Sequence, residues 1–241
     1  MNSLTHDTFF NGQLSVKQPL NGYRFSIDAV ILGNLADVKP GEKILDLGTG
    51  CGVIPLILCF RHPDTGMVFG AEIQRGLAQI ANENMTDNKL QDKITILHTD
   101  IKEITPADTN GRVESVICNP PHFAEKSGRI NPDSRRAVAR HEIAMNLSDL
   151  ASAASRMLLP GGRLTVIYPC ERLADLLEAM RQYGIEPKKI RTIHPAPQNP
   201  ARKVLAYGIM GKNPGLSIEP PLYIRTDNDS YSREVDAMFR P

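Results

Sequence analysis

The chain has 241 residues, a formal net charge of +1 and 41% hydrophobic residues, a size and composition typical of one α/β domain with a buried core. No apolar run reaches the ~18 residues that cross a membrane, and no signal-peptide pattern precedes the first expected strand. The four cysteines lie far apart and form no C-x-x-C pair, which argues against zinc and disulfides and favours a cytoplasmic protein without a metal site.

The N-terminal part is expected to contain a strand and a helix. Residues 14–18 alternate polar and apolar side chains, and Pro19 ends this strand pattern. Ser26 is a suitable N-cap for a helix over residues 27–35. Asp28 would lie in the first turn of that helix, where a carboxylate complements the helix dipole, so a structural role is at least as well supported as a role in ligand binding.

A glycine-rich stretch follows, and the rest of the chain is organised around it. Residues 44–47 predict a short buried strand with Asp46 near its carboxyl end, and the apolar run 53–60 predicts a helix. Three glycines at alternate positions join the two, namely Gly48, Gly50 and Gly52. A strand, a glycine turn and a helix are the parts of a nucleotide site, because glycine allows close backbone approach to a ligand and the helix start offers free N–H groups.

The spacing of these glycines limits which class of nucleotide ligand the turn would bind. A dinucleotide-binding fingerprint has a third glycine where this chain has Val53, and the lysine and hydroxyl of a P-loop are missing here. The spacing Asp46-x-Gly48-x-Gly50-x-Gly52 instead resembles the first motif of the seven-stranded S-adenosylmethionine (SAM) methyltransferases. An ordinary strand-to-helix turn stays open as the alternative at this point, whereas Val53 disfavours an NAD dehydrogenase.

Two further strands end next to acidic residues. The strand expected over residues 67–72 ends in Glu72, about 20 residues past the glycines, where nucleotide-binding sheets place an acceptor for ribose hydroxyls. A strand over residues 93–98 is followed by Asp100, which could accept a hydrogen bond from the amino group of an adenine. Because ligands bind at the carboxyl ends of parallel strands, these two acids and Asp46 together predict one cofactor site.

The fourth strand of this series, over residues 112–118, runs directly into Asn119, Pro120 and Pro121. Each proline fixes φ at about −65° and lacks an N–H, so Asn119 is held extended and the carbonyl of Pro120 stays free to accept a hydrogen bond. Such a run is often only a turn, but its position after a strand and downstream of three strand-end acids favours a functional loop.

The C-terminal part completes the expected sheet. Its elements are a helix over residues 147–158, a strand over 163–168, a helix over 172–183 and a hairpin of strands 185–194 and 204–210. The predicted fold class is α/β, with a seven-stranded Rossmann-like sheet and a C-terminal antiparallel hairpin. We expect one domain over residues 1–241, made of an N-terminal cofactor and substrate lid (1–40), a core (41–212) and a surface tail with a short helix near its end (213–241).

Charge is distributed unevenly along the chain. Residues 1–118 hold 10 Lys and Arg against 14 Asp and Glu, residues 119–212 hold 15 against 8, and residues 213–241 hold 3 against 5. The basic middle includes an arginine-rich segment over residues 124–142. This charge indicates a polyanionic partner such as RNA, whose phosphates it would contact, and a solvated charged loop is the alternative.

Together these motifs resemble a known enzyme family. Asp46 to Gly52, combined with Asn119-Pro-Pro-His122, is similar to the amino-methyltransferases that act on adenine N6, guanine N2 or a glutamine amide. Residues 23–28 (Tyr-Arg-Phe-Ser-Ile-Asp) and 135–142 (Arg-Arg-Ala-Val-Ala-Arg-His-Glu) narrow the resemblance to the bacterial tRNA(Val) adenine-37 N6-methyltransferase family, over nearly the whole chain. One departure is His122, where the family usually has tyrosine; an imidazole also stacks on a base, but with less area.

The resemblance implies SAM as the cofactor, tRNA as the partner and N6-methylation of adenosine 37, next to the anticodon of tRNA(Val), as the reaction. It implies that the catalytic residues are Asn119, Pro120, Pro121 and His122. It implies cofactor contacts from Phe25, Asp28, Asp46, Gly48, Thr49, Gly50, Cys51, Gly52, Glu72, Ile73, Asp100, Ile101 and Asn119. It implies substrate contacts from His122, Phe123, Arg135, Arg136 and Arg140.

Three alternatives stay open on the sequence alone. The same Asn-Pro-Pro chemistry would serve methylation of a protein glutamine amide or of guanine N2 in rRNA, and the chain could also bind SAM or RNA without catalysis. The amide alternative gains nothing from the arginine-rich segment, and the intact run from Asn119 to Pro121 argues against a loss of catalysis. The oligomeric state is open, with a monomer slightly favoured.

Overall fold

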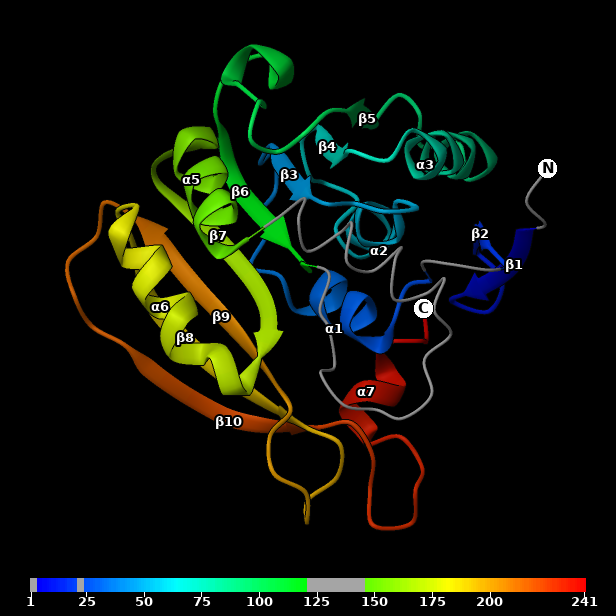
Figure 1. Cartoon of the computed structure of the whole chain (residues 1–241). Coiled ribbons are helices and arrows are strands. Elements are labelled where there is room, and N and C mark those ends of the chain that lie inside the picture. The colour runs from blue at the N-terminus through cyan, green and yellow to red at the C-terminus, as the bar shows by residue number, and fades with distance from the viewer. Residues whose placement is uncertain (1–3, 21–23, 121–145) are drawn as a thin grey trace, which may run out of the picture.

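The computed structural model describes residues 4–20, 24–120 and 146–241, and its centre is a mixed sheet of eight strands (Figure 1). The strand order across this sheet is β10-β8-β9-β7-β6-β3-β4-β5. Its strands are β3 (Ile44–Leu47), β4 (Val68–Glu72), β5 (Ile94–His98), β6 (Val113–Cys118), β7 (Leu158–Pro169), β8 (Ile185–His194), β9 (Lys203–Met210) and β10 (Ser217–Tyr223). A separate antiparallel hairpin is formed by β1 (Leu4–Phe9) and β2 (Leu14–Pro19).

The strands from β7 to β5 in this order run parallel to one another, which confirms the α/β fold expected from the sequence. β3 and β4 are buried along their whole length, as parallel strands are when helices cover both faces of a sheet. The chain continues from β3 to β4 and β5 on one side and returns as β6 and β7 on the other, so the strand order reverses between β3 and β6. Open parallel sheets bind ligands at the carboxyl ends of the strands at such a point.

β9 is antiparallel to both β7 and β8, and this pairing confirms the expected C-terminal hairpin. Beyond β8 the sheet gains an eighth strand, β10, in a segment that the sequence analysis described as a surface tail. Pro220 and Pro221 interrupt the strand pattern in the sequence, but proline is tolerated in a strand at the edge of a sheet. The pairing of β10 with β8 shifts register between Glu219 and Leu222, around these two prolines.

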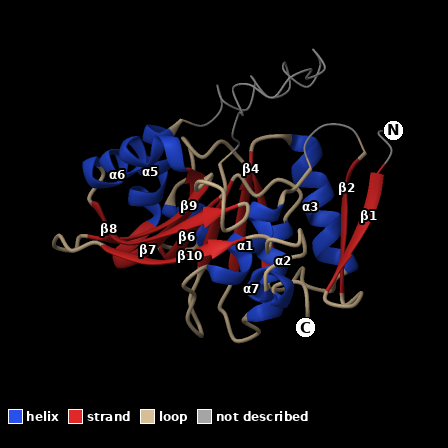
Figure 2. Ribbon diagram, turned by 90° about the horizontal axis from the view of Figure 1, so that it is seen from below, coloured by secondary structure: helices blue, strands red, loops and turns tan. Residues whose placement is uncertain are grey.

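Helices cover the two faces of the sheet (Figure 2). α1, α2 and α3 pack with the hairpin around one hydrophobic cluster, and α5 and α6 pack around a second cluster on the opposite face. The bounds are α1 (Ile27–Leu35), α2 (Val53–Arg61), α3 (Arg75–Asp87), α5 (Leu147–Met157), α6 (Leu173–Gln182) and α7 (Arg233–Ala237), with short 3-10 turns η1 (Pro106–Thr109) and η2 (Cys170–Arg172). Across the described ranges, we find no helix with the length and apolar character that a membrane span requires.

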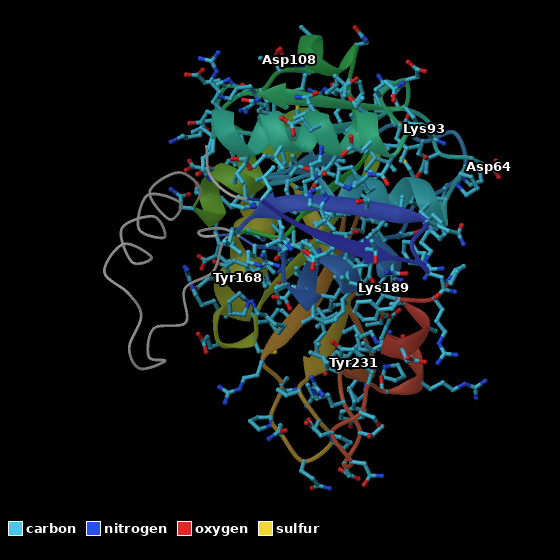
Figure 3. The ribbon with its side chains drawn as sticks, turned by 90° about the vertical axis from the view of Figure 1, so that its right-hand side faces the viewer. Asp64, Lys93, Asp108, Tyr168, Lys189 and Tyr231 are labelled. Atoms are coloured by element: carbon cyan, nitrogen blue, oxygen red, sulfur yellow. The ribbon has the colours of Figure 1, made fainter. Side chains whose placement is uncertain are left out.

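The N-terminal hairpin lies beside α3 (Figure 3). β2 falls on the residues that the sequence analysis assigned to a strand, whereas β1 was not expected. The two strands are joined by a tight turn in which Phe10, Asn11 and Gly12 have positive φ. Asn84 of α3 and Asn88, the C-cap of α3, hydrogen-bond to the backbone of β2, so the hairpin is attached to the helix through polar side chains.

Five of the seven phenylalanines of the chain gather where the hairpin, α2 and the C-terminal tail meet: Phe9, Phe10, Phe25, Phe60 and Phe239. The ring centroid of Phe9 lies 5.3 Å from that of Phe25 and 6.3 Å from that of Phe239. The guanidinium of Arg61 lies 4.4 Å from the centroid of Phe10 and donates to three backbone carbonyls at the end of the tail. These contacts hold the C-terminal tail against the hairpin and fix the segment that leads into α1.

Candidate active site

The glycine turn between β3 and α2 has a backbone conformation that glycine adopts without strain. Gly48, Gly50 and Gly52 have φ values of 77°, 60° and 81°. The N–H groups of Gly48 and Thr49 both donate to the carbonyl of Ala71 in β4, at 2.9 and 3.0 Å. The motif therefore forms a tight turn that is tied to the neighbouring strand.

The space around this turn is also tight at two glycines, where an added Cβ would meet neighbouring atoms. A Cβ on Gly52 would lie 2.6 Å from Cε of Met85 and 3.3 Å from Cβ of Ala81, so α3 packs directly on the turn. A Cβ on Gly70 of β4 would lie 2.9 Å from the hydroxyl and from the methyl group of Thr49. The turn is thus enclosed by β4 on one side and α3 on another.

Asp46 brings a buried carboxyl group to this site. Asp46 is 0% exposed, and neither of its carboxylate oxygens has a hydrogen-bond partner within the described residues. The buried hydroxyl of Thr49 also has no hydrogen-bond partner among these residues. Burial raises the pKa of Asp46 to about 7; the nearby hydroxyl of Thr49 opposes this rise and the charge of Glu72 adds to it. Because buried polar atoms are costly without partners, these groups indicate a place for a ligand that carries hydrogen-bond donors.

Glu72 ends β4 and is only 4% exposed. Its Oε2 accepts the N–H of Gly50 at 2.9 Å, and its Oε1 accepts the N–H of Gln74 at 2.8 Å. Each oxygen retains a lone pair, so the carboxylate can also accept the two hydroxyl hydrogens of a ribose. The next residue, Ile73, is 41% exposed and places an apolar side chain beside this carboxylate, which suits the flat face of a nucleobase.

Asp100 follows β5 at the same edge of the sheet. Its Oδ1 accepts the N–H of Lys102 at 2.9 Å, and its Oδ2 lies 3.6 Å from the ammonium group of Lys102. The side chain of Ile101 is instead buried in the hydrophobic cluster of α5 and α6, and its carbonyl accepts a hydrogen bond from Arg156 at 2.8 Å. Of these two neighbours, Asp100 is the one whose side chain is open to a ligand.

Asp28 lies in the first turn of α1, as the sequence analysis expected. Its N–H donates to the hydroxyl of the N-cap Ser26, and its carboxylate lies 3.3 Å from the ammonium group of Lys203 at the start of β9. This ion pair joins α1 to the carboxyl edge of the sheet and gives Asp28 a structural role. Phe25, just before the cap, packs on Phe9 of the hairpin.

Asn119 and Pro120 follow β6 directly. β6 pairs with β3 so that Cys118 lies opposite Leu47, the residue before the glycine turn, and the thiol of Cys118 donates to the carbonyl of Leu47 at 3.0 Å. The Asn-Pro run and the glycine turn thus leave neighbouring strands at the same level. The remaining expected site residues lie outside the described residues: Pro121, His122, Phe123, Arg135, Arg136 and Arg140.

One residue beside the glycine turn, Asn84 of α3, was not expected from the sequence. It is 0% exposed, and its side-chain amide donates to the carbonyl of Cys51 in the turn at 2.8 Å. The thiol of Cys51 is itself buried, which raises its pKa to about 12 and keeps it uncharged. The available signal was an asparagine inside a helix, where this residue is disfavoured unless its side chain finds a partner.

The site as a whole is a set of acceptors around a glycine turn. It combines the carboxylates of Asp46, Glu72 and Asp100 with Asn119, which follows β6, the strand next to β3. In the part of the chain that the structure describes, no three His, Cys, Asp or Glu side chains are arranged to hold a metal ion. The acceptor set fits SAM, because SAM carries donors in its amino group, its ribose hydroxyls and its adenine amino group.

Comparison with known proteins agrees with this chemistry. Residues 28–182 match a family model described as the methyltransferase small domain. The chain is 32% identical over 206 residues to a tRNA1(Val) (adenine(37)-N6)-methyltransferase of Porphyromonas gingivalis, a match that covers 83% of this chain and 80% of the relative. A protein of the same name from Tolumonas auensis is 26% identical, with 94% of this chain and 92% of the relative covered.

Solved structures show a similar fold. A protein described as a predicted O-methyltransferase from Agrobacterium tumefaciens superimposes with a TM-score of 0.70 at 22% identity, covering 88% of this chain and 94% of that one. A SAM-dependent O-methyltransferase from Thermotoga maritima has a TM-score of 0.53 at 16% identity, with 80% and 68% covered. At these identities the likeness concerns the fold alone, which is the Rossmann-like sheet that the sequence predicted.

Proposed function

This chain belongs to the methyltransferase small domain family, and we propose that it transfers a methyl group from SAM to the N6 nitrogen of adenine 37 in tRNA(Val). The observation that carries the proposal is the position of Asn119 and Pro120, which leave β6 beside the glycine turn that follows β3. The relatives from P. gingivalis and T. auensis support the choice of substrate, since both bear the name of this activity.

The glycine turn and the strand-end acids would hold SAM. Asp46 and Thr49 would pair with its polar groups, Glu72 would accept its ribose hydroxyls, and Ile73 and Asp100 would contact its adenine. When bound, SAM supplies an electrophilic methyl group on a sulfonium. This assignment gives the Asp46 carboxylate the donors that it lacks within the described chain.

The adenine amino group is a poor nucleophile, because its lone pair is delocalised into the ring. The side-chain oxygen of Asn119 and the backbone carbonyl of Pro120 would each accept one hydrogen of this amino group. The two acceptors localise the lone pair on nitrogen and stabilise the positive charge that develops there. No general base is needed before transfer, since the proton becomes acidic only afterwards.

The substrate base must leave its stack to reach these acceptors. Removing the base from its stack costs a few kcal/mol. The cost is lowest in a single-stranded loop, which favours an anticodon loop as the target. His122 and Phe123 would stack on the base, a contact worth roughly 1–3 kcal/mol per base. Arg135, Arg136 and Arg140 would contact the phosphate backbone, which positions the loop without reading its sequence.

Incubation with labelled SAM tests this function against its nearest alternatives. The purified chain is incubated in parallel with total bacterial tRNA and with a bacterial protein extract. We expect label in the tRNA fraction, as N6-methyladenosine. Label in the protein extract alone would instead point to a glutamine amide, and SAM binding without label in either fraction would point to an rRNA substrate or to a non-catalytic protein.

A further inference from the structure

Asn84 of α3 and Asn88, the C-cap of this helix, bond to the backbone of β2 as a neighbouring strand would. The N–H and carbonyl of Lys17 bond to the amide of Asn84, at 2.7 and 2.9 Å, and those of Ser15 bond to the amide of Asn88, at 2.9 and 2.7 Å. Four residues along a helix and two residues along a strand both span about 6–7 Å, so the two spacings match. Side chains of α3 therefore take the place of a third strand for the hairpin.

Asn84 makes one contact that Asn88 does not make. The amide nitrogen of Asn84 also donates to the carbonyl of Cys51 in the glycine turn at 2.8 Å, whereas that of Asn88 donates to the carbonyl of Asn84 within α3 at 2.7 Å. The oxygen and both amide hydrogens of Asn84 are thus used, and the residue is fully buried. A single side chain joins β2, α3 and the glycine turn.

The glycine turn is therefore held at three points. β4 supplies two of them, through the carbonyl of Ala71 and the carboxylate of Glu72, and α3 supplies the third, where Asn84 holds the carbonyl of Cys51. We propose that Asn84 is a positioning residue that shapes the turn for SAM and couples SAM binding to the N-terminal hairpin. This inference rests on the proposed function, which makes SAM the ligand of the turn.

The hairpin also reaches the start of α1. The buried side chain of Gln18 in β2 accepts the N–H of Phe25 at 3.2 Å and donates to the carboxylate of Asp7. Phe25 leads into α1, whose Asp28 is paired with Lys203 at the carboxyl edge of the sheet. A shift of the hairpin would thus be transmitted both to the glycine turn and to the start of α1, and by linkage SAM on the turn would restrain the hairpin.

Two matched substitutions in the full chain test the role of Asn84. Asn84→Asp keeps an oxygen for the N–H of Lys17 but replaces the donor with an oxygen that faces the carbonyls of Lys17 and Cys51. Asn88→Asp makes the same change against the carbonyls of Ser15 and Asn84, away from the turn. We expect calorimetry to show SAM affinity weakened about tenfold by Asn84→Asp, the size of one lost buried hydrogen bond, and changed less than about twofold by Asn88→Asp.

A second pair, Asn84→Ala and Asn88→Ala, covers the case in which a buried charge keeps Asn84→Asp from folding. Thermal unfolding establishes that each variant is folded before binding is measured. Saturating SAM is expected to slow hydrogen exchange of the Val16 amide, which pairs with Asp7 inside the hairpin, in wild type and in Asn88→Ala, but not in Asn84→Ala, because coupling between two sites is reciprocal. An asparagine with a structural role alone would lower stability without changing this response.

The outcomes separate this inference from the proposed function. A folded Asn84 variant that binds SAM as tightly as wild type, with the same protection of Val16 by SAM, would overturn the inference and leave the proposed function standing. A wild-type chain that binds no SAM would overturn both.

Discussion

The carboxylate of Glu72 accepts the backbone N–H of Gly50 at 2.9 Å, so the acid that ends β4 is fixed to the turn that follows β3. The same carboxylate accepts the N–H of Gln74 at 2.8 Å, at the start of the next helix. One buried side chain therefore shapes the turn and, in the proposed site, presents acceptors to the ribose of SAM. Removal of this carboxylate is expected to affect both the shape of the turn and the binding of SAM.

Glu72→Ala is predicted to weaken SAM binding by at least about tenfold, since two N–H groups and the ribose hydroxyls lose their acceptor. Glu72→Gln keeps one side-chain oxygen and is expected to lose less. Isothermal calorimetry with SAM measures both variants against wild type. Unchanged affinity in Glu72→Ala would remove this residue from the cofactor site.

Asp46→Asn is predicted to stabilise the unliganded protein more at pH 8 than at pH 5. Because the pKa of Asp46 is about 7 in the folded chain, above its ordinary value of 3.8, folding takes up a proton between these values. The carboxyl group therefore lowers the free energy of unfolding progressively as the pH rises from about 4 to about 7, and by up to about 4 kcal/mol above that range.

Thermal unfolding of wild type and Asp46→Asn at the two pH values measures this effect. Titrating groups that do not interact with Asp46 contribute equally to both proteins, so the difference between them reports on Asp46 and on its coupling to Glu72. The advantage of the variant is expected to grow by about 2–3 kcal/mol from pH 5 to pH 8. An advantage that stays the same at both values would contradict the buried, unpaired carboxylate described here.

Asn119→Ala is predicted to leave SAM affinity within about twofold of wild type and to reduce methyl transfer by about a hundredfold or more, since one preorganised acceptor is lost where positive charge develops. Single-turnover transfer of label from SAM to tRNA measures the rate, and calorimetry measures cofactor binding. A variant that turns over as fast as wild type would refute the role given to Asn119.

Gly52→Ala is predicted to cost more stability than Gly41→Ala, although both glycines have positive φ, at 81° and 77°. A Cβ on Gly52 would meet Met85 at 2.6 Å and Ala81 at 3.3 Å, whereas a Cβ on Gly41 has nothing within 4 Å. The comparison thus cancels the backbone strain and leaves the overlap with α3, which we expect to cost about 1–3 kcal/mol in urea unfolding. Equal losses of stability in the two variants would mean that α3 moves to accommodate the added Cβ at no energetic cost.

The parallel strands could be predicted because each of them carries its own local signal. β3, β4, β5 and β6 are short apolar runs that end in a glycine turn, an acid or the Asn-Pro run, and ligand-binding edges of such sheets collect these ends. β10 carried no such signal, because Pro220 and Pro221 break its pattern and only its place at the edge of the sheet makes them acceptable.

Candidate site residues could be proposed from the sequence where they lie at strand ends, and not where they depend on packing between distant segments. Asp46 near the end of β3, Glu72 at the end of β4 and Asp100 just past β5 were proposed in this way. The ion pair of Asp28 with Lys203 and the bond from Asn84 to the turn join segments that are far apart in the chain. No local sequence pattern specifies such partners, so the sequence did not identify Asn84 as a residue of the site.

Two transcripts of tRNA(Val) that differ at one base, with adenine or guanine at position 37, give the sharpest test of the proposed reaction. Each is incubated with the purified chain and labelled SAM, and the nucleosides are separated after digestion. We expect labelled N6-methyladenosine from the transcript with adenine 37 and none from the other. Equal labelling of both transcripts, or labelling of neither by a chain that binds SAM, would contradict the proposed reaction.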